Sequence, residues 1–175
     1  FFQSHLTMVI GAYKTGNLIG QGRSASMDHH LIDIGIPESY LQDLSPARLV
    51  DAETVIFPSR YDHAHKGDYG EVMILAGSPG MAGAAILAAK AALRSGAGYV
   101  RLFAHPQLAD SYIGANPELL IETVPLSSDG KVDTSALQAR VHDPAAILIG
   151  PGIGTGLYGS SLLEFALTLK GIPLV

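Results

Sequence analysis

Two glycine-rich segments are the parts of the sequence best suited to binding a ligand. Residues 77–83 read Gly-Ser-Pro-Gly-Met-Ala-Gly, and residues 150–156 read Gly-Pro-Gly-Ile-Gly-Thr-Gly. Each lies between an apolar run and a helix-forming run, where unpaired backbone N–H groups and the helix dipole attract anions. Neither matches G-x-G-x-x-G or the Walker A pattern. Spacing alone therefore leaves two readings open, a phosphate-binding loop or a tight turn between a strand and a helix.

Two short segments that contain histidines are further candidates for a functional site. His63, His65 and Lys66 precede the first strand of the regular part of the chain, and they suit either a metal pair or a phosphate clamp. No third ligand is near in sequence, so we expect a solvated basic segment and no metal. The cluster from Asp28 to His30 is equally well explained as a polar loop that leads into a strand. Because no nucleophile elbow or His-Glu-x-x-His helix occurs, spacing alone does not name a reaction.

An alternation of strands and helices must position these residues. From residue 72 onward, short apolar runs alternate with helix-forming runs, which predicts parallel strands joined by right-handed crossovers. The expected strands are 72–76, 99–103, 120–124 and 145–149, the expected helices are 84–94, 133–141 and 160–169, and a further strand is expected to start at 172–175. Glu118 could open a helix and Glu164 could lie on a helix surface, but neither has an evident partner. The predicted class is α/β.

The first part of the chain is less regular. Two β-prone runs, 6–10 and 30–34, flank a glycine-rich polar segment, 16–28, which we expect to be a long loop. Two strands cannot bury a core of their own, so this part must either pack on the following domain or belong to a preceding one, and we expect the second. Residues 38–57 are expected to form a linker with a short helix at 46–52.

Composition excludes several classes of protein. The chain has 175 residues, of which 47% are hydrophobic and 15% are charged, with a net charge of −5 and no cysteine. No basic patch for nucleic acid appears, thiolate chemistry and disulfides are excluded, and no apolar run reaches the roughly 20 residues of a membrane span. We expect a cytoplasmic enzyme with neither a nucleic-acid nor a membrane partner.

Specific residues carry a resemblance to a known family. The segment His65-Lys66-Gly67-Asp68-Tyr69-Gly70 is followed in register by strand 72–76, Gly77-Ser78, Gly83-Ala84 and the run 91–98. Residues 117–119 and 149–154 continue the match. This order resembles the NAD(P)H-hydrate dehydratase family, a branch of the ribokinase-like fold, over residues 58–175. The resemblance implies a doubly wound, mostly parallel sheet with helices on both faces, incomplete at the C-terminus.

The resemblance also implies an activity. Family members use ADP or ATP with Mg²⁺ to phosphorylate the hydroxyl of hydrated NADH or NADPH, after which phosphate leaves and the cofactor is restored. By resemblance, Gly83, Ala84, Gly152 and Gly154 would line the hydrated nucleotide. The segment that binds ADP and the catalytic aspartate have no counterpart before Val175, so the base is expected beyond it, and residues 1–175 alone should turn over nothing.

The start of the chain resembles the tail of the NAD(P)H-hydrate epimerase domain, which uses K⁺. The residues that carry this resemblance are 7–11, Lys14, Gly16 and 32–37. We therefore expect an epimerase tail at 1–37, a linker at 38–57, a dehydratase part at 58–175, and a homo-oligomeric bifunctional parent protein. The alternatives are another ribokinase-like kinase of small molecules, such as a hydroxyethylthiazole or hydroxymethylpyrimidine kinase, and a non-catalytic nucleotide-binding module.

Overall fold

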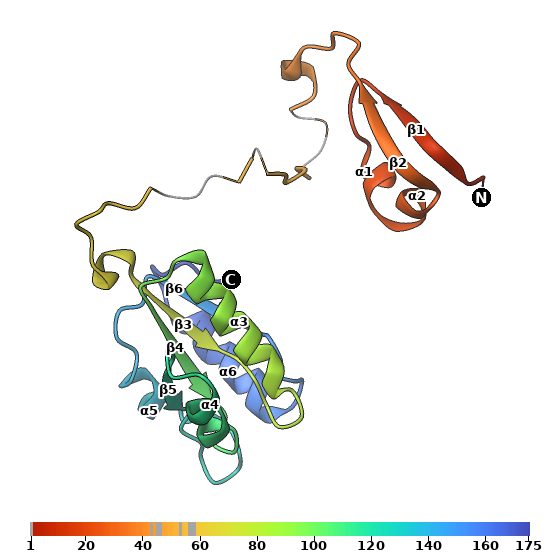
Figure 1. Cartoon of the computed structure of the whole chain (residues 1–175). Coiled ribbons are helices and arrows are strands. Elements are labelled where there is room, and N and C mark those ends of the chain that lie inside the picture. The colour runs from red at the N-terminus through yellow and green to blue at the C-terminus, as the bar shows by residue number, and fades with distance from the viewer. Residues whose placement is uncertain (1, 43, 45–46, 53, 56–58) are drawn as a thin grey trace. The chain divides into compact units, whose positions relative to one another are not determined.

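The chain divides into two compact units, residues 1–59 and 60–175. The structure is a computed structural model and describes residues 2–42, 44, 47–52, 54–55 and 59–175 (Figure 1).

A parallel four-stranded sheet forms the centre of the second unit. Its strands are β3 (Glu71–Leu75), β4 (Tyr99–Ala104), β5 (Leu120–Thr123) and β6 (Ala146–Ile149), and their order is β5-β4-β3-β6. Every neighbouring pair is parallel. Because parallel sheets are covered on both faces, their strands are mainly apolar. The strands here follow this rule apart from Glu71, Arg101 and Glu122, which pair with one another across β3, β4 and β5. The predicted α/β class with a parallel sheet is confirmed.

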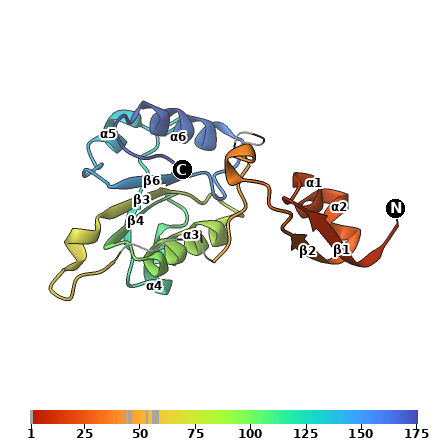
Figure 2. The ribbon, with the colours of Figure 1, turned by 90° about the horizontal axis from the view of Figure 1, so that it is seen from above.

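Helices cover both faces of this sheet (Figure 2). On one face α3 (Ala82–Ser95) and α4 (Ala109–Ala115) pack over a core that includes Ile74, Ala85 and Leu102. On the other face α5 (Thr134–Gln138) and α6 (Leu157–Thr168) pack over a core that includes Phe103 and Leu162. Both cores are therefore built on the same four strands.

The helices differ from the predicted ranges at their ends. Helix α3 ends at Gly96, whose φ of +107° suits the left-handed C-cap. Helix α5 begins as expected, because the Asp133 carboxylate accepts a hydrogen bond from the Ala136 N–H at 3.0 Å, but it ends at Gln138. Helix α6 begins three residues earlier than expected, and Glu164 lies exposed on it. Helix α4 was not predicted, and Glu118 follows it in a turn instead of opening a helix.

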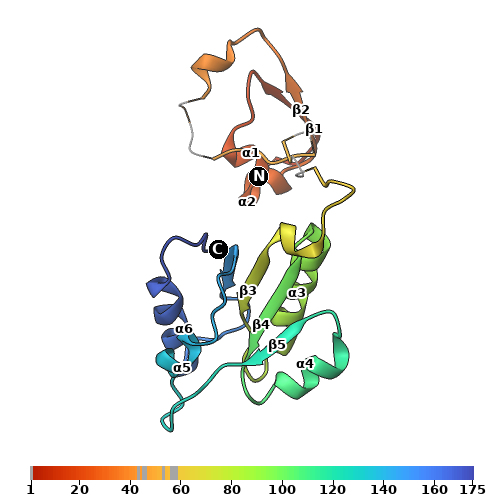
Figure 3. The same ribbon diagram turned by 90° about the vertical axis from the view of Figure 1, so that its left-hand side faces the viewer.

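The last residues add to the outer edge of β6, as predicted for a starting strand (Figure 3). Leu174 forms a parallel bridge with Ile147. The Ile147 N–H donates to the Pro173 carbonyl at 2.9 Å, and the Val175 N–H donates to the Ile147 carbonyl at 2.9 Å. Among the described residues, no helix is both long and apolar enough to cross a bilayer.

The first unit contains two parallel strands, β1 (Ser4–Ile10) and β2 (Ser26–Ile32). The predicted long loop was wrong, because α1 (Thr15–Leu18) and α2 (Gly20–Ser24) occupy most of it. A parallel pair needs a crossover, and these short helices supply it. Strand β2 also begins earlier than expected, since Ser26 already pairs with Ser4.

The predicted helix at 46–52 is not observed at residues 47–52, which are irregular, and Pro46 lies outside the described residues. A single 3-10 turn, η1 (Glu38–Tyr40), is found earlier in this segment.

Candidate functional site

The strand order places both glycine segments at one point of the sheet. From β3 the chain moves to β4 and then to β5, and it returns to the other side of β3 to form β6. The order of the strands therefore reverses between β3 and β6. In open α/β sheets, ligands bind outside the carboxyl ends of the strands at such a reversal. Residues 77–83 follow β3 and residues 150–156 follow β6, so both lie there.

Hydrogen bonds join the two glycine segments directly. The Gly77 N–H donates to the Pro151 carbonyl at 2.8 Å. The Ser78 hydroxyl donates to the Gly152 carbonyl at 2.8 Å, and Ser78 is buried. These contacts make the two turns one rigid unit, which is what pre-organised recognition of a ligand requires. We call residues 77–84 and 150–156 the glycine rim.

Gly152 lies where no other residue fits. A Cβ atom added there would lie 2.7 Å from the Met81 carbonyl oxygen and 3.0 Å from the Ala84 Cβ, and its φ is +69°. Left-handed backbone of this kind favours glycine. The structure thus brings Ala84 and Gly152, two of the four predicted site residues, into contact.

The other two predicted residues, Gly83 and Gly154, are exposed on the same rim. A Cβ at Gly83 would meet nothing within 4 Å, and one at Gly154 would lie 3.4 Å from the Met81 methyl carbon. Gly83 and Ala84 belong to the first turn of α3, whose N–H groups have no partner within the helix. Backbone donors and small side chains therefore meet at one surface, which suits a ligand that carries phosphate.

Aromatic side chains beside the rim were missed by the sequence reasoning. Tyr112 from α4 donates its hydroxyl to the Ala82 carbonyl at 3.0 Å, which ties α4 to the start of α3. His105 follows β4 directly, and its ring meets the Tyr158 ring edge-on at 4.9 Å between centroids. The position of His105 after a strand could have suggested a rim residue, whereas nothing in the local sequence signals Tyr112 or Tyr158.

Burial shifts the titration of all three side chains. Loss of solvent lowers the pKa of the His105 imidazole, which favours the neutral ring. Burial also raises the pKa of Tyr112, and it raises the pKa of Tyr158 further, with a smaller contribution from the charge of Tyr112. The Tyr158 hydroxyl is buried and has no hydrogen-bond partner among the described residues.

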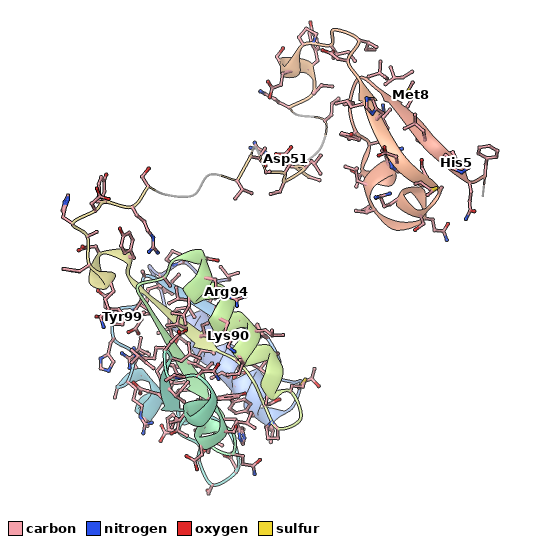
Figure 4. The ribbon with its side chains drawn as sticks, viewed as in Figure 1. His5, Met8, Asp51, Lys90, Arg94 and Tyr99 are labelled. Atoms are coloured by element: carbon pink, nitrogen blue, oxygen red, sulfur yellow. The ribbon has the colours of Figure 1, made fainter. Side chains whose placement is uncertain are left out.

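The histidine segment lies at the opposite edge of the sheet. His65 is an exposed neighbour of Asp68, with 3.3 Å between Nδ1 and Oδ2. The turn η2 (Lys66–Tyr69) precedes β3, and the Lys66 ammonium lies 4.7 Å from the centre of the Tyr99 ring. Tyr99 itself lies at the start of β4 (Figure 4). The histidine segment therefore lies away from the glycine rim. Within the described ranges, no group of three or more His, Asp or Glu side chains could hold a metal ion.

A separate groove of about 1120 Å³ lies in the first unit. It opens beyond the carboxyl end of β1, and its polar lining includes Tyr13, Lys14, Thr15 and Arg48. The Lys14 ammonium already donates to the Ile10 carbonyl at 2.6 Å. The lining of this groove lacks the glycine turns and the reversal of strand order that point to a ligand at the rim.

The reversal of strand order beside two glycine turns is typical of a doubly wound α/β domain. The fold is similar to that of a "ribokinase-like superfamily protein" from Enterococcus faecalis, with a TM-score of 0.58 and 24% identity. That likeness covers 67% of this chain and 40% of the other. The family model described as NAD(P)H-hydrate dehydratase matches residues 72–175, more than half of the chain. The chain therefore belongs to the NAD(P)H-hydrate dehydratase family.

Individual relatives agree with this assignment. The chain is 32% identical to the "Bifunctional NAD(P)H-hydrate repair enzyme Nnr" of Coxiella burnetii, over 93% of this chain and 32% of the relative. It is 32% identical to the "ADP-dependent (S)-NAD(P)H-hydrate dehydratase" of Staphylococcus aureus, over 65% of this chain and 39% of the relative. The chain also matches a crystal structure of the ADP/ATP-dependent NAD(P)H-hydrate dehydratase from Bacillus subtilis, co-crystallized with ATP/Mg²⁺. The TM-score is 0.53 and the identity 31%, and the match covers 67% of this chain and 40% of the other. The chain thus spans about a third of the length of the bifunctional relatives.

Proposed function

We propose that the full-length protein containing this chain repairs hydrated nicotinamide nucleotides. It dehydrates the (S)-hydrates of NADH and NADPH at the expense of ADP or ATP, and it interconverts the (R) and (S) hydrates. The observation that carries the proposal is the glycine rim, in which the Ser78 hydroxyl and the Gly77 N–H join two turns that match the family in order and spacing. The repair enzymes named above support the choice of substrate.

In this proposal Gly83, Ala84, Gly152 and Gly154 line the hydrated nucleotide. Gly83 and Ala84 offer the N–H groups of the first helical turn to its phosphate oxygens, because that end of α3 is the positive end of the dipole. Gly152 and Gly154 permit close approach of the ligand, since neither carries a side chain on the surface of the rim. The chain's own contribution is then to bind and orient the substrate.

The nucleotide co-substrate supplies the phosphoryl group that turns the hydroxyl of the hydrate into a leaving group. Transfer of this kind depends mainly on positioned anion-binding groups, a metal ion and a base. The glycine rim fits the first requirement. The described residues hold no cluster of carboxylates or histidines for Mg²⁺, so we assign neither a metal site nor a catalytic base to them.

In this proposal the chain contains three parts. Residues 1–37 are the tail of an epimerase domain, residues 38–57 are a linker, and residues 58–175 belong to the dehydratase domain. The parallel β1–β2 pair and crossover helices of the first unit are compatible with the edge of a larger α/β domain. Dependence of the epimerase on K⁺, a homo-oligomeric assembly and a cytoplasmic location complete the proposal.

Ligand-dependent thermal stability tests the substrate. A ligand present at 100 times its dissociation constant stabilises the folded state by about 2.7 kcal/mol. The (S)-hydrate of NADH should therefore raise the melting temperature of the full-length gene product by several degrees. A small alcohol of the kind that related kinases phosphorylate, such as hydroxyethylthiazole, should leave it unchanged. The opposite pattern would favour the small-molecule kinase and reject the proposal.

A further inference from the structure

His105 is held in one orientation at the carboxyl edge of the sheet. It follows β4, the strand next to β3, so it lies on the same edge as the glycine rim. Its Nδ1 atom accepts a hydrogen bond from the Gln107 N–H at 3.2 Å, and its ring meets the Tyr158 ring at 77°. One backbone contact and one aromatic contact thus fix both the position and the plane of the imidazole.

These contacts determine where the proton lies on the ring. Because Nδ1 accepts a hydrogen bond, the neutral imidazole carries its proton on Nε2. Burial lowers the pKa of His105 and favours this neutral form. The side chain is only partly buried, and its Nε2–H has no hydrogen-bond partner among the residues that the structure describes. An oriented donor without a partner on the edge that binds ligands is suited to an oxygen acceptor.

We propose that His105 is a further substrate-binding residue, which donates its Nε2–H to an oxygen of the hydrated nucleotide, and that Tyr158 is its positioning residue. The inference rests on the proposed function, because that function supplies a ligand rich in phosphate and ribose oxygens. Three adjacent strands then each contribute to the site: β6 and β3 through the glycine rim, and β4 through His105. Tyr158 acts through its ring, since its hydroxyl is buried.

Steady-state kinetics of the full-length gene product with the (S)-hydrate of NADH and ADP test the inference. His105→Phe keeps an aromatic ring against Tyr158 but removes the donor, so KM for the hydrate should rise about tenfold, the loss expected for one hydrogen bond to a charged group. The value of kcat should stay the same, because the contact binds substrate and transition state equally. His105→Gln places an amide N–H near the position of Nε2 and should restore most of the affinity.

Two controls separate binding from folding. His142→Phe changes an exposed histidine that precedes β6 at the opposite edge of the sheet, and it should leave KM unchanged. Tyr158→Leu removes the aromatic contact that orients the imidazole but keeps the donor, so it should raise KM.

Three outcomes would overturn the inference. An unchanged KM for His105→Phe would show that the side chain does not bind the substrate. Equal losses for His105→Phe and His105→Gln, with equally lowered melting temperatures, would show a structural role. A wild-type protein that neither binds nor dehydrates the hydrate would instead reject the proposed function, and the inference with it.

Discussion

Replacing Arg101 by methionine should lower the free energy of unfolding by about 3 kcal/mol, because it leaves two carboxylates without their shared partner in a poorly solvated place. The Arg101 Nε and Nη2 atoms donate to the two carboxylate oxygens of Glu71 at 2.8 and 3.0 Å. The Nη1 atom donates to Glu122 at 2.5 Å. The three side chains are only 18%, 15% and 24% exposed, so solvent screens them weakly. The hydrogen bond to Glu71, opposed by burial, raises the pKa of Arg101.

A triple variant serves as the control for the effect of charge. Changing Glu71 and Glu122 to glutamine in the Arg101→Met background removes the unpaired charges and should recover most of the lost stability. Urea unfolding followed by circular dichroism gives the comparison. If the single variant loses less than 1 kcal/mol, or if the triple variant is no better than the single one, the ion network does not join β3, β4 and β5 in the way described.

The second large effect is expected at Gly152. Gly152→Ala should lower the free energy of unfolding by about 2–3 kcal/mol, since alanine in left-handed backbone costs roughly 1–2 kcal/mol and the new Cβ also meets the Met81 carbonyl. The same change should weaken binding of the hydrate, because relief of this contact must separate the two glycine turns. Thermal melting with and without the hydrate measures both effects.

Gly83→Ala is the matched control on the same rim. A Cβ there meets nothing within 4 Å, and the residue lies within α3, so alanine should raise stability by roughly 0.5–1 kcal/mol. If Gly83 lines the substrate, the more stable variant should nevertheless bind the hydrate less tightly. A Gly152→Ala protein as stable as the wild type would contradict the close approach of the two turns.

Much of the second unit was predictable from sequence because its strands are short apolar runs bounded by glycine. The runs at 72–76 and 145–149 became β3 and β6 within one residue. The edge on which both glycine segments lie also follows from parallel topology. Helix α4 was not predicted because it is short, with seven residues, and is held by the Tyr112 contact to α3.

The first unit was less predictable for a physical reason. Its helices α1 and α2 have four and five residues and contain three glycines between them, so no helical periodicity can develop. The aromatic part of the rim was also hidden, because His105 and Tyr158 are 53 positions apart and only the fold brings their rings together. Periodicity reports on single elements, whereas such contacts depend on the order of the strands.

The most direct test of the proposed function is recovery of NADH absorbance from its purified (S)-hydrate. With the full-length gene product, ADP or ATP and Mg²⁺, the absorbance should return, and it should not return when the nucleotide is omitted. Residues 1–175 alone, assayed in parallel, should turn over nothing. A folded full-length protein that restores no NADH with either nucleotide would contradict the account.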